Sequence, residues 1–155
     1  MAHISFAGAK YSLGPEESVL ECLERAEYEI PFSCRNGVCL TCMMRVREGE
    51  PPRASQKDLR EGQRQQGYFL PCVCHPEDDL DIESPSDAEL YGRGVVTDVT
   101  QLSANICRLR LKAATPLFYH AGQFINLRRG DGLVRSYSLA SVPRLEDTLE
   151  LHIKR

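Results

Sequence analysis

The chain has 155 residues, of which 42% are hydrophobic and 26% are charged, and its formal net charge at pH 7 is −3. This composition is typical of a globular protein, and no apolar run is long enough to cross a bilayer, so we expect no membrane partner. Lys and Arg do not form a dense stripe with interleaved aromatic residues, which argues against nucleic-acid binding.

The chain opens with two short strands and a helix. Residues 3–7 and 10–13 are expected to pair across an intervening turn. The helix is expected to begin within residues 14–17, with Pro15 and acidic residues in its first turn. Its apolar residues recur at helical spacing: Val19, Cys22, Leu23 and Ala26. Cys22 is therefore predicted to be a small buried hydrophobic residue and not a metal ligand.

Residues 34–42 contain three Cys at the spacing C-x4-C-x2-C, and a distant Cys follows at position 72. This is the plant-type ligand spacing of a [2Fe–2S] cluster. Two irons bridged by two sulfides still need two thiolates each, and irregular backbone is needed to turn three side chains inward over so short a segment. Gly37 suits such a loop because it tolerates positive φ and has no Cβ. The N–H groups of residues 35–41 are expected to donate to the sulfurs, which tunes the reduction potential.

Zinc and disulfides are the two alternative uses of these Cys. A structural zinc site usually takes paired C-x2-C motifs, but Cys39 and Cys42 form the one such pair, because a single residue separates Cys72 from Cys74. Disulfides are disfavoured because the chain opens without a secretory signal and its seven Cys are an odd number. The same observations predict a reducing, cytoplasmic location.

After the loop, the pattern predicts strands and at most one short helix. A strand is expected at residues 43–48 and the helix near residues 55–60. An apolar strand at residues 67–73 would carry Cys72, and a strand at residues 79–83 would close the module. These elements predict a small mixed sheet with a helix across it.

Residues 1–84 resemble a plant-type [2Fe–2S] ferredoxin domain. Two motifs carry the resemblance: Cys34-Arg35-x-Gly37-x-Cys39-x-x-Cys42 and Leu70-x-Cys72-x3-Pro76. The resemblance implies an α+β fold of the β-grasp type, with four iron ligands: Cys34, Cys39, Cys42 and Cys72. Cys74 falls where the family carries an ordinary residue, and Leu40 stands where many relatives have a smaller one.

A domain boundary is expected in the polar stretch Ser84-Pro85-Ser86-Asp87, with a linker at residues 85–90 and a second domain at residues 91–155. Residues 1–83 contain 9 Lys and Arg against 15 Asp and Glu, whereas residues 84–155 contain 10 against 7. The second, basic part is the better host for an anionic cofactor.

The second domain shows period-2 patterns with little helical signal, which favours an antiparallel β-barrel. The expected strands lie at residues 94–99, 107–112, 122–127, 134–139 and 148–154. Cys107 is one of the apolar residues that alternate with charged ones in the second of these strands. It is therefore predicted to be a core residue and not a redox thiol.

Residues 135–138, Arg-Ser-Tyr-Ser, resemble the Arg-x-Tyr-Ser signature of the FAD domain in the ferredoxin–NADP reductase superfamily. Flanking motifs agree with it: Pro116-x5-Gly122-Gln123-Phe124 and Leu139-Ala140-Ser141. The resemblance implies that Arg135 pairs with the FAD pyrophosphate, that Tyr137 lies on the isoalloxazine ring and that the Ser138 hydroxyl reaches flavin N5. It also places residues 152–154 near the pyrimidine edge of the flavin. The alternative is an exposed Arg and a packed Tyr on a barrel strand.

The domain order resembles the one-chain reductase components of bacterial oxygenases, of the benzoate dioxygenase reductase type. It implies electron transfer from NAD(P)H through FAD and the cluster to an acceptor protein such as a Rieske or di-iron oxygenase, with no catalytic side chain. The related barrel has six strands and is followed by a nicotinamide domain, whereas this chain stops at Arg155 on its fifth expected strand. We therefore expect the N-terminal portion of a longer reductase, with the FAD domain C-terminally incomplete. Acceptor docking is expected around Arg35, Leu40 and Met44.

Two hypotheses from other classes stay open. The chain could be a stand-alone [2Fe–2S] electron carrier that binds no flavin, which release of flavin on denaturation would contradict. It could also be a zinc-stabilised interaction module, which the colour of an oxidised [2Fe–2S] cluster would contradict.

Overall fold

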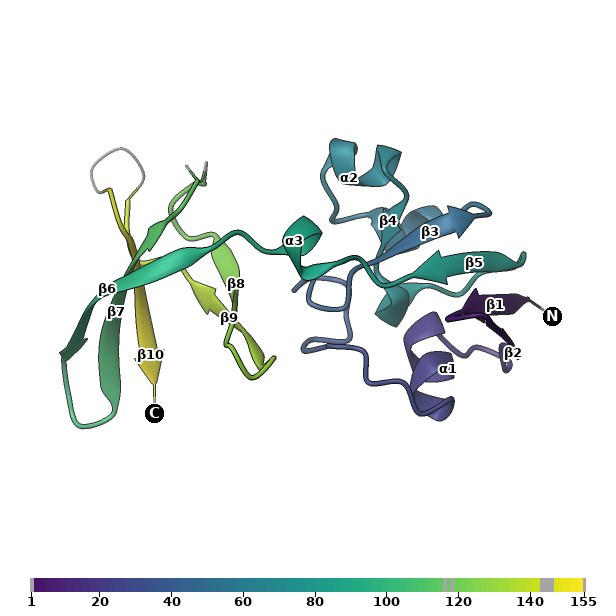
Figure 1. Cartoon of the computed structure of the whole chain (residues 1–155), viewed down its shortest axis with the longest axis horizontal. Coiled ribbons are helices and arrows are strands. Elements are labelled where there is room, and N and C mark those ends of the chain that lie inside the picture. The colour runs from purple at the N-terminus through teal and green to yellow at the C-terminus, as the bar shows by residue number, and fades with distance from the viewer. Residues whose placement is uncertain (1, 116, 118, 143–146, 155) are drawn as a thin grey trace. The chain divides into compact units, whose positions relative to one another are not determined.

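The computed structural model describes residues 2–115, 117, 119–142 and 147–154 (Figure 1). Pro116 and Arg155, which entered the sequence-based expectations, lie outside the described residues. The chain divides into two compact units, Met1–Ser86 (unit 1) and Asp87–Arg155 (unit 2). Each unit has its own strands and its own core. No described helix has the length and apolar character needed to span a membrane.

Unit 1 is built on a five-stranded mixed sheet in the order β2-β1-β5-β3-β4. Its strands are β1 (His3–Phe6), β2 (Ala9–Ser12), β3 (Met44–Glu48), β4 (Tyr68–Phe69) and β5 (Leu80–Glu83). β5 pairs parallel with β1 and antiparallel with β3, so the last strand of the unit lies between two earlier ones. The predicted α+β fold of the β-grasp type is confirmed.

The helix of unit 1, α1 (Val19–Arg25), begins later than the sequence pattern indicated. Glu16 has a φ of 58°, which takes the backbone out of the right-handed helical region, so Pro15 does not open the helix. Ser18 is the N-cap instead. Its hydroxyl accepts from the N–H of Glu21, whose carboxylate accepts from the N–H of Ser18, which makes a capping box. The helix buries four residues in the core: Val19, Leu20, Cys22 and Leu23. The burial predicted for Cys22 is confirmed.

The segment between β3 and β5 differs from the expected pattern. One helix near residues 55–60 is replaced by a 3-10 helix, Arg53–Gln56, and a short α-helix, α2 (Glu61–Gln65). The strand expected at residues 67–73 is reduced to β4. Pro71 has no N–H to donate to a ladder, and a 3-10 helix, Pro71–Val73, begins there. Cys72 therefore lies on this 3-10 helix and not on a strand.

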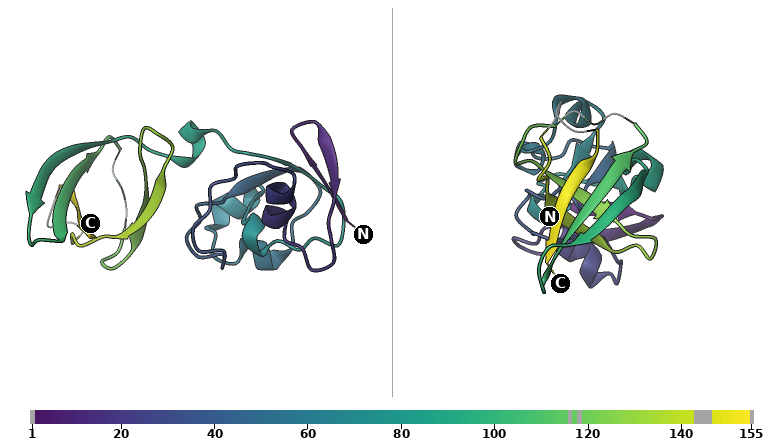
Figure 2. Two further views of the ribbon diagram at one scale, coloured as in Figure 1. Left: turned by 90° about the horizontal axis from the view of Figure 1, so that it is seen from below. Right: turned by 90° about the vertical axis from the view of Figure 1, so that its left-hand side faces the viewer.

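Unit 2 opens with the four-residue helix α3 (Asp87–Leu90), which the sequence pattern did not predict. Its strands are β6 (Gly94–Gln101), β7 (Ile106–Ala113), β8 (Phe124–Arg128), β9 (Val134–Ser138) and β10 (Leu149–Lys154). They form an antiparallel sheet in the order β10-β7-β6 and an antiparallel pair β8-β9, joined by a bridge between Leu139 and Leu151. Figure 2 shows the strong curvature of these strands. The described strands form the predicted partial barrel without closing it.

The core of unit 2 takes residues from both of its sheets. Its buried residues are leucines: Leu111, Leu139, Leu149 and Leu151. Partly buried side chains from β8 and β9, among them Ile125, Leu127 and Tyr137, pack against them. Cys107 on β7 is buried, which confirms its assignment as a core residue.

Candidate iron–sulfur centre and flavin-binding strand

The loop that connects α1 to β3 carries three of the four predicted iron ligands. Its backbone enters the left-handed region three times, with φ values of 54° at Arg35, 74° at Gly37 and 59° at Leu40. Residues with a Cβ seldom adopt this conformation, so the surrounding structure must hold Arg35 and Leu40 in it. A Cβ on Gly37 would lie 3.0 Å from Cγ2 of Val73. Gly37 therefore lets the loop approach the 3-10 helix that carries Cys72.

The four predicted ligands lie as two pairs. The Cys39 thiol and the Cys39 N–H both donate to Cys34, with 3.4 Å between Cys39 N and Cys34 Sγ. The Cys42 thiol donates to Cys72. Within the described residues, no three or more His, Cys, Asp or Glu side chains are grouped for one metal ion. Two pairs of thiols instead match the need of a two-iron cluster for two thiolates at each iron.

Backbone N–H groups of the loop point at Cys34. Burial opposes ionisation of this thiol, but the N–H groups of Asn36, Cys39 and Val38 outweigh burial and lower the pKa of Cys34 to about 7. Asn36 N lies 3.3 Å from Cys34 Sγ. The loop therefore favours a thiolate, the form that binds metal.

Cys42 and Cys72 form a donor–acceptor pair, in which the Cys42 thiol keeps its proton. The hydrogen bond from the Cys42 thiol is the largest cause that lowers the pKa of Cys72, to about 6. Burial opposes this shift, while the N–H of Gly37 and the positive charge of Arg35 add to it. The same hydrogen bond, together with burial, raises the pKa of Cys42. Each pair thus combines one buried thiol, Cys39 or Cys42, with one that is partly exposed.

The buried hydroxyl of Thr41 shows whether the loop has room for a hydrogen-bond acceptor such as a [2Fe–2S] group. Thr41 lies between Cys39 and Cys42, is 4% exposed, and its hydroxyl has no hydrogen-bond partner among the described residues. Leaving a buried hydroxyl without a partner costs about 1–3 kcal/mol. A cluster held by the flanking thiolates would bring acceptor sulfurs into this loop. The donor set and the unpartnered hydroxyl therefore both fit a [2Fe–2S] group.

The other Cys of unit 1 have structural surroundings. Burial raises the pKa of Cys74 to about 12 and also raises the pKa of Cys22. The carbonyl of Cys74 accepts the N–H of Val19 at 2.9 Å, which attaches the start of α1 to the segment after the fourth predicted ligand. All seven Cys are free thiols, so no disulfide competes for the predicted ligands.

The docking surface expected around Arg35, Leu40 and Met44 needs a correction. Met44 is 1% exposed, because β3 places it opposite Phe69 in the core of unit 1. The exposed apolar side chains of this region are Phe32 and Val38, which sequence reasoning did not single out. Phe32 directly follows a proline and Val38 lies between two loop residues, and neither position has a periodic signal.

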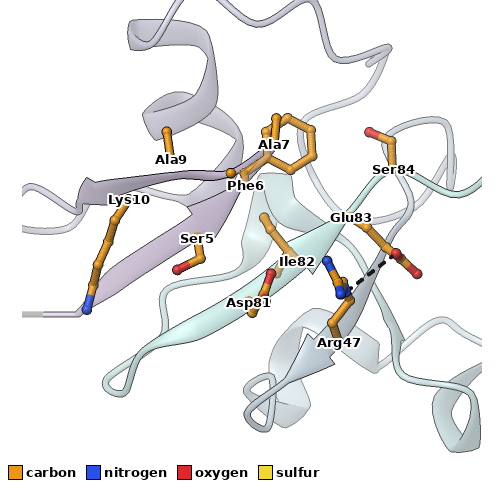
Figure 3. A pocket seen from close by; sticks show the side chains of 11 residues that line it. Ser5, Phe6, Ala7, Ala9, Lys10, Arg47, Asp81, Ile82, Glu83 and Ser84 are labelled. Carbon is orange, nitrogen blue, oxygen red and sulfur yellow. Dashed lines mark ion pairs between the residues drawn. The ribbon is translucent and has the colours of Figure 1, made fainter.

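A hollow of about 450 Å³ lies on another part of unit 1 (Figure 3). It is lined by the β1–β2 turn, by β5 and by Arg47 of β3. Arg47 Nε is 3.8 Å from Oε2 of Glu83, which also binds Arg45. None of the predicted ligands lines this hollow, so it is separate from the candidate iron site.

The predicted flavin-binding residues lie on β9. Arg135 and Tyr137 are paired in register with Leu127 and Ile125 of β8. Because side chains alternate along a strand, Arg135 and Tyr137 share one face and Ser138 belongs to the other. Tyr137 is half-buried against the leucine core, whereas Arg135 is exposed and its Nη1 donates to the carbonyl of Val134 at 3.2 Å.

The motifs that flank β9 are brought close to it. The N–H of Leu139 donates to the carbonyl of Gln123 at 2.7 Å, which joins the two flanking segments. Ser141 Oγ lies 2.9 Å from the Tyr119 hydroxyl and accepts the N–H of Glu150 at 3.1 Å. Residues 152–154 lie on β10, which pairs with β7 and not with β9. The structure thus brings β9 and its two flanking segments together, whereas residues 152–154 lie on β10, in the other sheet.

Comparison with known proteins gives two family matches. Residues 5–77 match the 2Fe-2S iron-sulfur cluster binding domain, and residues 93–155 match the oxidoreductase FAD-binding domain. Ferredoxin-2 of a Synechococcus species is 36% identical over 81 residues, which cover 52% of this chain and 77% of that protein.

Two relatives align with both units. The reductase component DmpP of phenol 2-monooxygenase from a Pseudomonas species is 35% identical over 149 residues, covering 89% of this chain and 42% of that protein. The reductase subunit of an aromatic O-demethylase from an Amycolatopsis species is 32% identical over 161 residues, covering 98% and 48%. This chain spans about half the length of the curated relatives it matches over both units.

These matches agree with the two thiol pairs of unit 1 and with the curved antiparallel strands of unit 2. The cofactors are accordingly a [2Fe–2S] cluster and FAD. The chain belongs to the iron–sulfur flavoproteins in which a plant-type ferredoxin domain precedes an FAD-binding domain of the ferredoxin reductase type, a family that includes the one-chain reductase components of aromatic oxygenases.

Proposed function

We propose that this chain carries electrons from FAD to a [2Fe–2S] cluster within an NAD(P)H-dependent reductase, and from the cluster to an acceptor protein such as a Rieske or di-iron oxygenase component. The observation that carries the proposal is the presence, in one chain, of two thiol pairs in unit 1 and the Arg-x-Tyr-Ser strand in unit 2. The two relatives that align with both units are reductase components of aromatic oxygenation and demethylation systems by name.

The residues of this chain have binding roles in the proposal. The flavin supplies the chemistry that turns a two-electron hydride into the single electrons that a [2Fe–2S] cluster accepts. Cys34 and Cys39 hold one iron, and Cys42 and Cys72 hold the other, as their pairing in the structure supports. The loop amides and the Thr41 hydroxyl donate to the sulfurs. We assign no catalytic side chain.

The flavin residues are assigned by their places on β9. Arg135 is exposed and positively charged, which suits a charge-assisted contact with the pyrophosphate. Tyr137 presents a ring on the same face of the strand, which suits stacking on the isoalloxazine. Ser138 offers a hydroxyl for flavin N5 at the end of the strand.

The proposed location is the cytoplasm. Seven free thiols, four of them reserved for iron, suit a reducing compartment. The proposed acceptor is an oxygenase component that takes one electron at a time.

Anaerobic purification with iron, sulfide and FAD tests the proposal. We expect charge-transfer bands in visible light, a paramagnetic signal after reduction with dithionite, and stoichiometric FAD released on denaturation. Cytochrome c serves as a one-electron probe and should be reduced by the dithionite-reduced, desalted chain. Cluster signals without released FAD would favour the stand-alone electron carrier. Colourless protein that retains stoichiometric zinc would contradict the proposal and favour an interaction module.

A further inference from the structure

Arg35, which directly follows the first predicted ligand, is held from two sides. Its Nη2 donates to Oε1 of Glu24 at 2.6 Å, and its Nη1 donates to Oε2 at 3.1 Å. The guanidinium carbon lies 4.0 Å from the centroid of the Phe32 ring. We call Arg35, Glu24 and Phe32 the Arg35 clamp. A bidentate carboxylate contact together with an aromatic face fixes a guanidinium in position more firmly than a single exposed ion pair does.

The clamp joins the cluster loop to the helix. Glu24 lies on α1, so its two hydrogen bonds to Arg35 connect the loop to an element whose other face is buried in the core. Arg35 has a left-handed backbone, with a φ of 54°, and the N–H of the next residue, Asn36, points back to Cys34 Sγ at 3.3 Å. A left-handed residue other than Gly costs roughly 1–2 kcal/mol, so it needs such external support.

The guanidinium is tied to the cluster loop by the chain itself, because Arg35 directly follows Cys34, the first predicted ligand. Reduction of a [2Fe–2S] cluster adds one negative charge to its surroundings. Charges and hydrogen bonds around the sulfurs are among the factors that set the reduction potential of such clusters.

We propose that Arg35 is a positioning residue of the iron–sulfur centre: Glu24 and Phe32 hold its positive charge at the cluster loop, next to Cys34, and this charge favours the reduced cluster. The inference rests on the proposed ligation of a cluster by the four Cys of unit 1. Glu24 acts through Arg35 and not as an independent charge.

The test is an anaerobic redox titration of the full chain, with mediators poised by dithionite and the reduced cluster followed by its paramagnetic signal. Arg35→Gln should lower the equilibrium constant for one-electron reduction about threefold, which is a potential more negative by about 30 mV at 59 mV per tenfold. Arg35→Lys should restore part of the shift, because Lys keeps the charge but cannot make the bidentate contact.

A double-mutant comparison separates positioning from simple charge. Glu24→Gln in the Arg35→Gln background removes only a negative charge and should shift the potential in the positive direction. In the wild type, Glu24→Gln also frees the guanidinium of Arg35. The change in potential that Glu24→Gln causes there should therefore be more negative than the change it causes in Arg35→Gln, by about threefold in the equilibrium constant for reduction. Equal shifts in the two backgrounds would show that the charges act independently and would overturn the positioning role.

Arg25, on the helix that carries Glu24, provides a matched control. Its Nε and Nη2 make a bidentate pair with Glu17 at 2.8 and 3.0 Å, and its other contacts are Ser12 and Cys22. Arg25→Gln should leave the potential unchanged, and a shift as large as that of Arg35→Gln would contradict the inference.

Iron content and visible absorption separate the two levels of failure. Wild-type chain without a cluster would overturn the proposed function and the inference together. Loaded variants with the potential of the wild type would overturn the inference alone. If Arg35→Gln does not retain a cluster, Arg35→Lys and Glu24→Gln decide the question. A more negative potential for Arg35→Lys supports the clamp, and wild-type potentials for both variants contradict it.

Discussion

The two units hold their cofactor residues in different ways. In unit 1 three of the four proposed iron ligands lie on the irregular backbone of one loop, which contacts a helix on one side and, on the other, the 3-10 helix that carries the fourth. In unit 2 the proposed flavin residues lie on a regular strand, and their places follow from its pairing with β8. The described core is also larger in unit 1, where it includes residues from α1 and from four strands, β1, β3, β4 and β5, than in unit 2, where four leucines form it.

The difference between the units indicates which changes each site tolerates. The iron site depends on backbone conformation, so a single added methyl group can disturb it. The flavin site depends on exposed side chains, so its substitutions should change affinity for FAD and leave folding largely intact. Substitutions in both units therefore test this difference.

The largest effect is expected from removal of a ligand. Cys42→Ala should abolish the charge-transfer bands, because one iron then lacks a thiolate, while FAD binding by unit 2 stays unchanged. Cys74→Ala is the control, since this thiol is also buried in unit 1 but lies in neither pair. Iron content and visible spectra measure both variants. Loss of the bands in Cys74→Ala alone would move the site away from the assigned ligands.

The next largest effect is expected from Gly→Ala changes at two positive-φ positions. Gly37→Ala combines strain at a φ of 74° with a Cβ 3.0 Å from Val73 Cγ2, and should destabilise unit 1 by about 2–3 kcal/mol and lower its iron content. Gly132→Ala in unit 2 has a φ of 89° and open space around the Cβ, so strain alone should cost about 1 kcal/mol. Chemical denaturation checks both, and equal losses would remove the distinction between the units.

A smaller effect is expected at the flavin strand. Arg135→Gln should weaken FAD binding about tenfold, because it removes a charge-assisted hydrogen bond of about 1.5 kcal/mol. Quenching of flavin fluorescence measures the affinity. Arg129→Gln is the control, because Arg129 is a second Arg of unit 2 and its guanidinium pairs with Asp131. If both variants bind FAD equally well, the pyrophosphate contact belongs to another residue.

The smallest effect is expected from an exposed carboxylate of each unit. The hydrogen bond from Arg129, with the N–H of Leu133, lowers the pKa of Asp131 to about 2, and Lys10, with the N–H of His3, lowers the pKa of Asp79 to about 2. Since these values lie below the unfolded pKa of about 3.9, each carboxylate stabilises its unit above pH 4, and the contribution disappears as pH falls through 2.

Thermal unfolding between pH 7 and pH 2 checks this expectation. Asp131→Asn should lower the melting temperature of unit 2 slightly at pH 7 and not at pH 2. Asp79→Asn should likewise lower the melting temperature of unit 1 slightly at pH 7. For unit 1 the comparison cannot be followed down to pH 2, because protonated thiols release iron before that pH is reached. A destabilisation that grows as the pH falls would contradict the stabilising role of these two carboxylates above pH 4.

Local spacing was enough to predict much of this molecule. The spacing of the Cys indicated the loop, and apolar periodicity placed Cys22 and Cys107 in the cores. The start of α1 was missed because the acidic residues after Pro15 resembled a first turn, although Ser18 and Glu21 carried the signal of a capping box. The order of the strands in unit 1 and the presence of α3 gave no local signal.

Contacts between distant segments were not predictable. Met44 falls on a strand that the sequence predicted, but the face on which it lies was not predicted, and its burial depends on pairing with Phe69. The Arg35 clamp depends on the direction in which α1 presents Glu24 to the loop. Both require the three-dimensional arrangement of unit 1 and leave no trace in residue spacing.

The central place of β5 has a consequence for biosynthesis. Because β5 separates β1 from β3, the sheet of unit 1 cannot become continuous until residues 80–83 have left the ribosome. Pairing of the first strand with the last also makes its contacts non-local, which slows folding. The three loop thiols are therefore synthesised well before the scaffold that orients them, so iron delivery must wait for, or assist, the closure of the sheet.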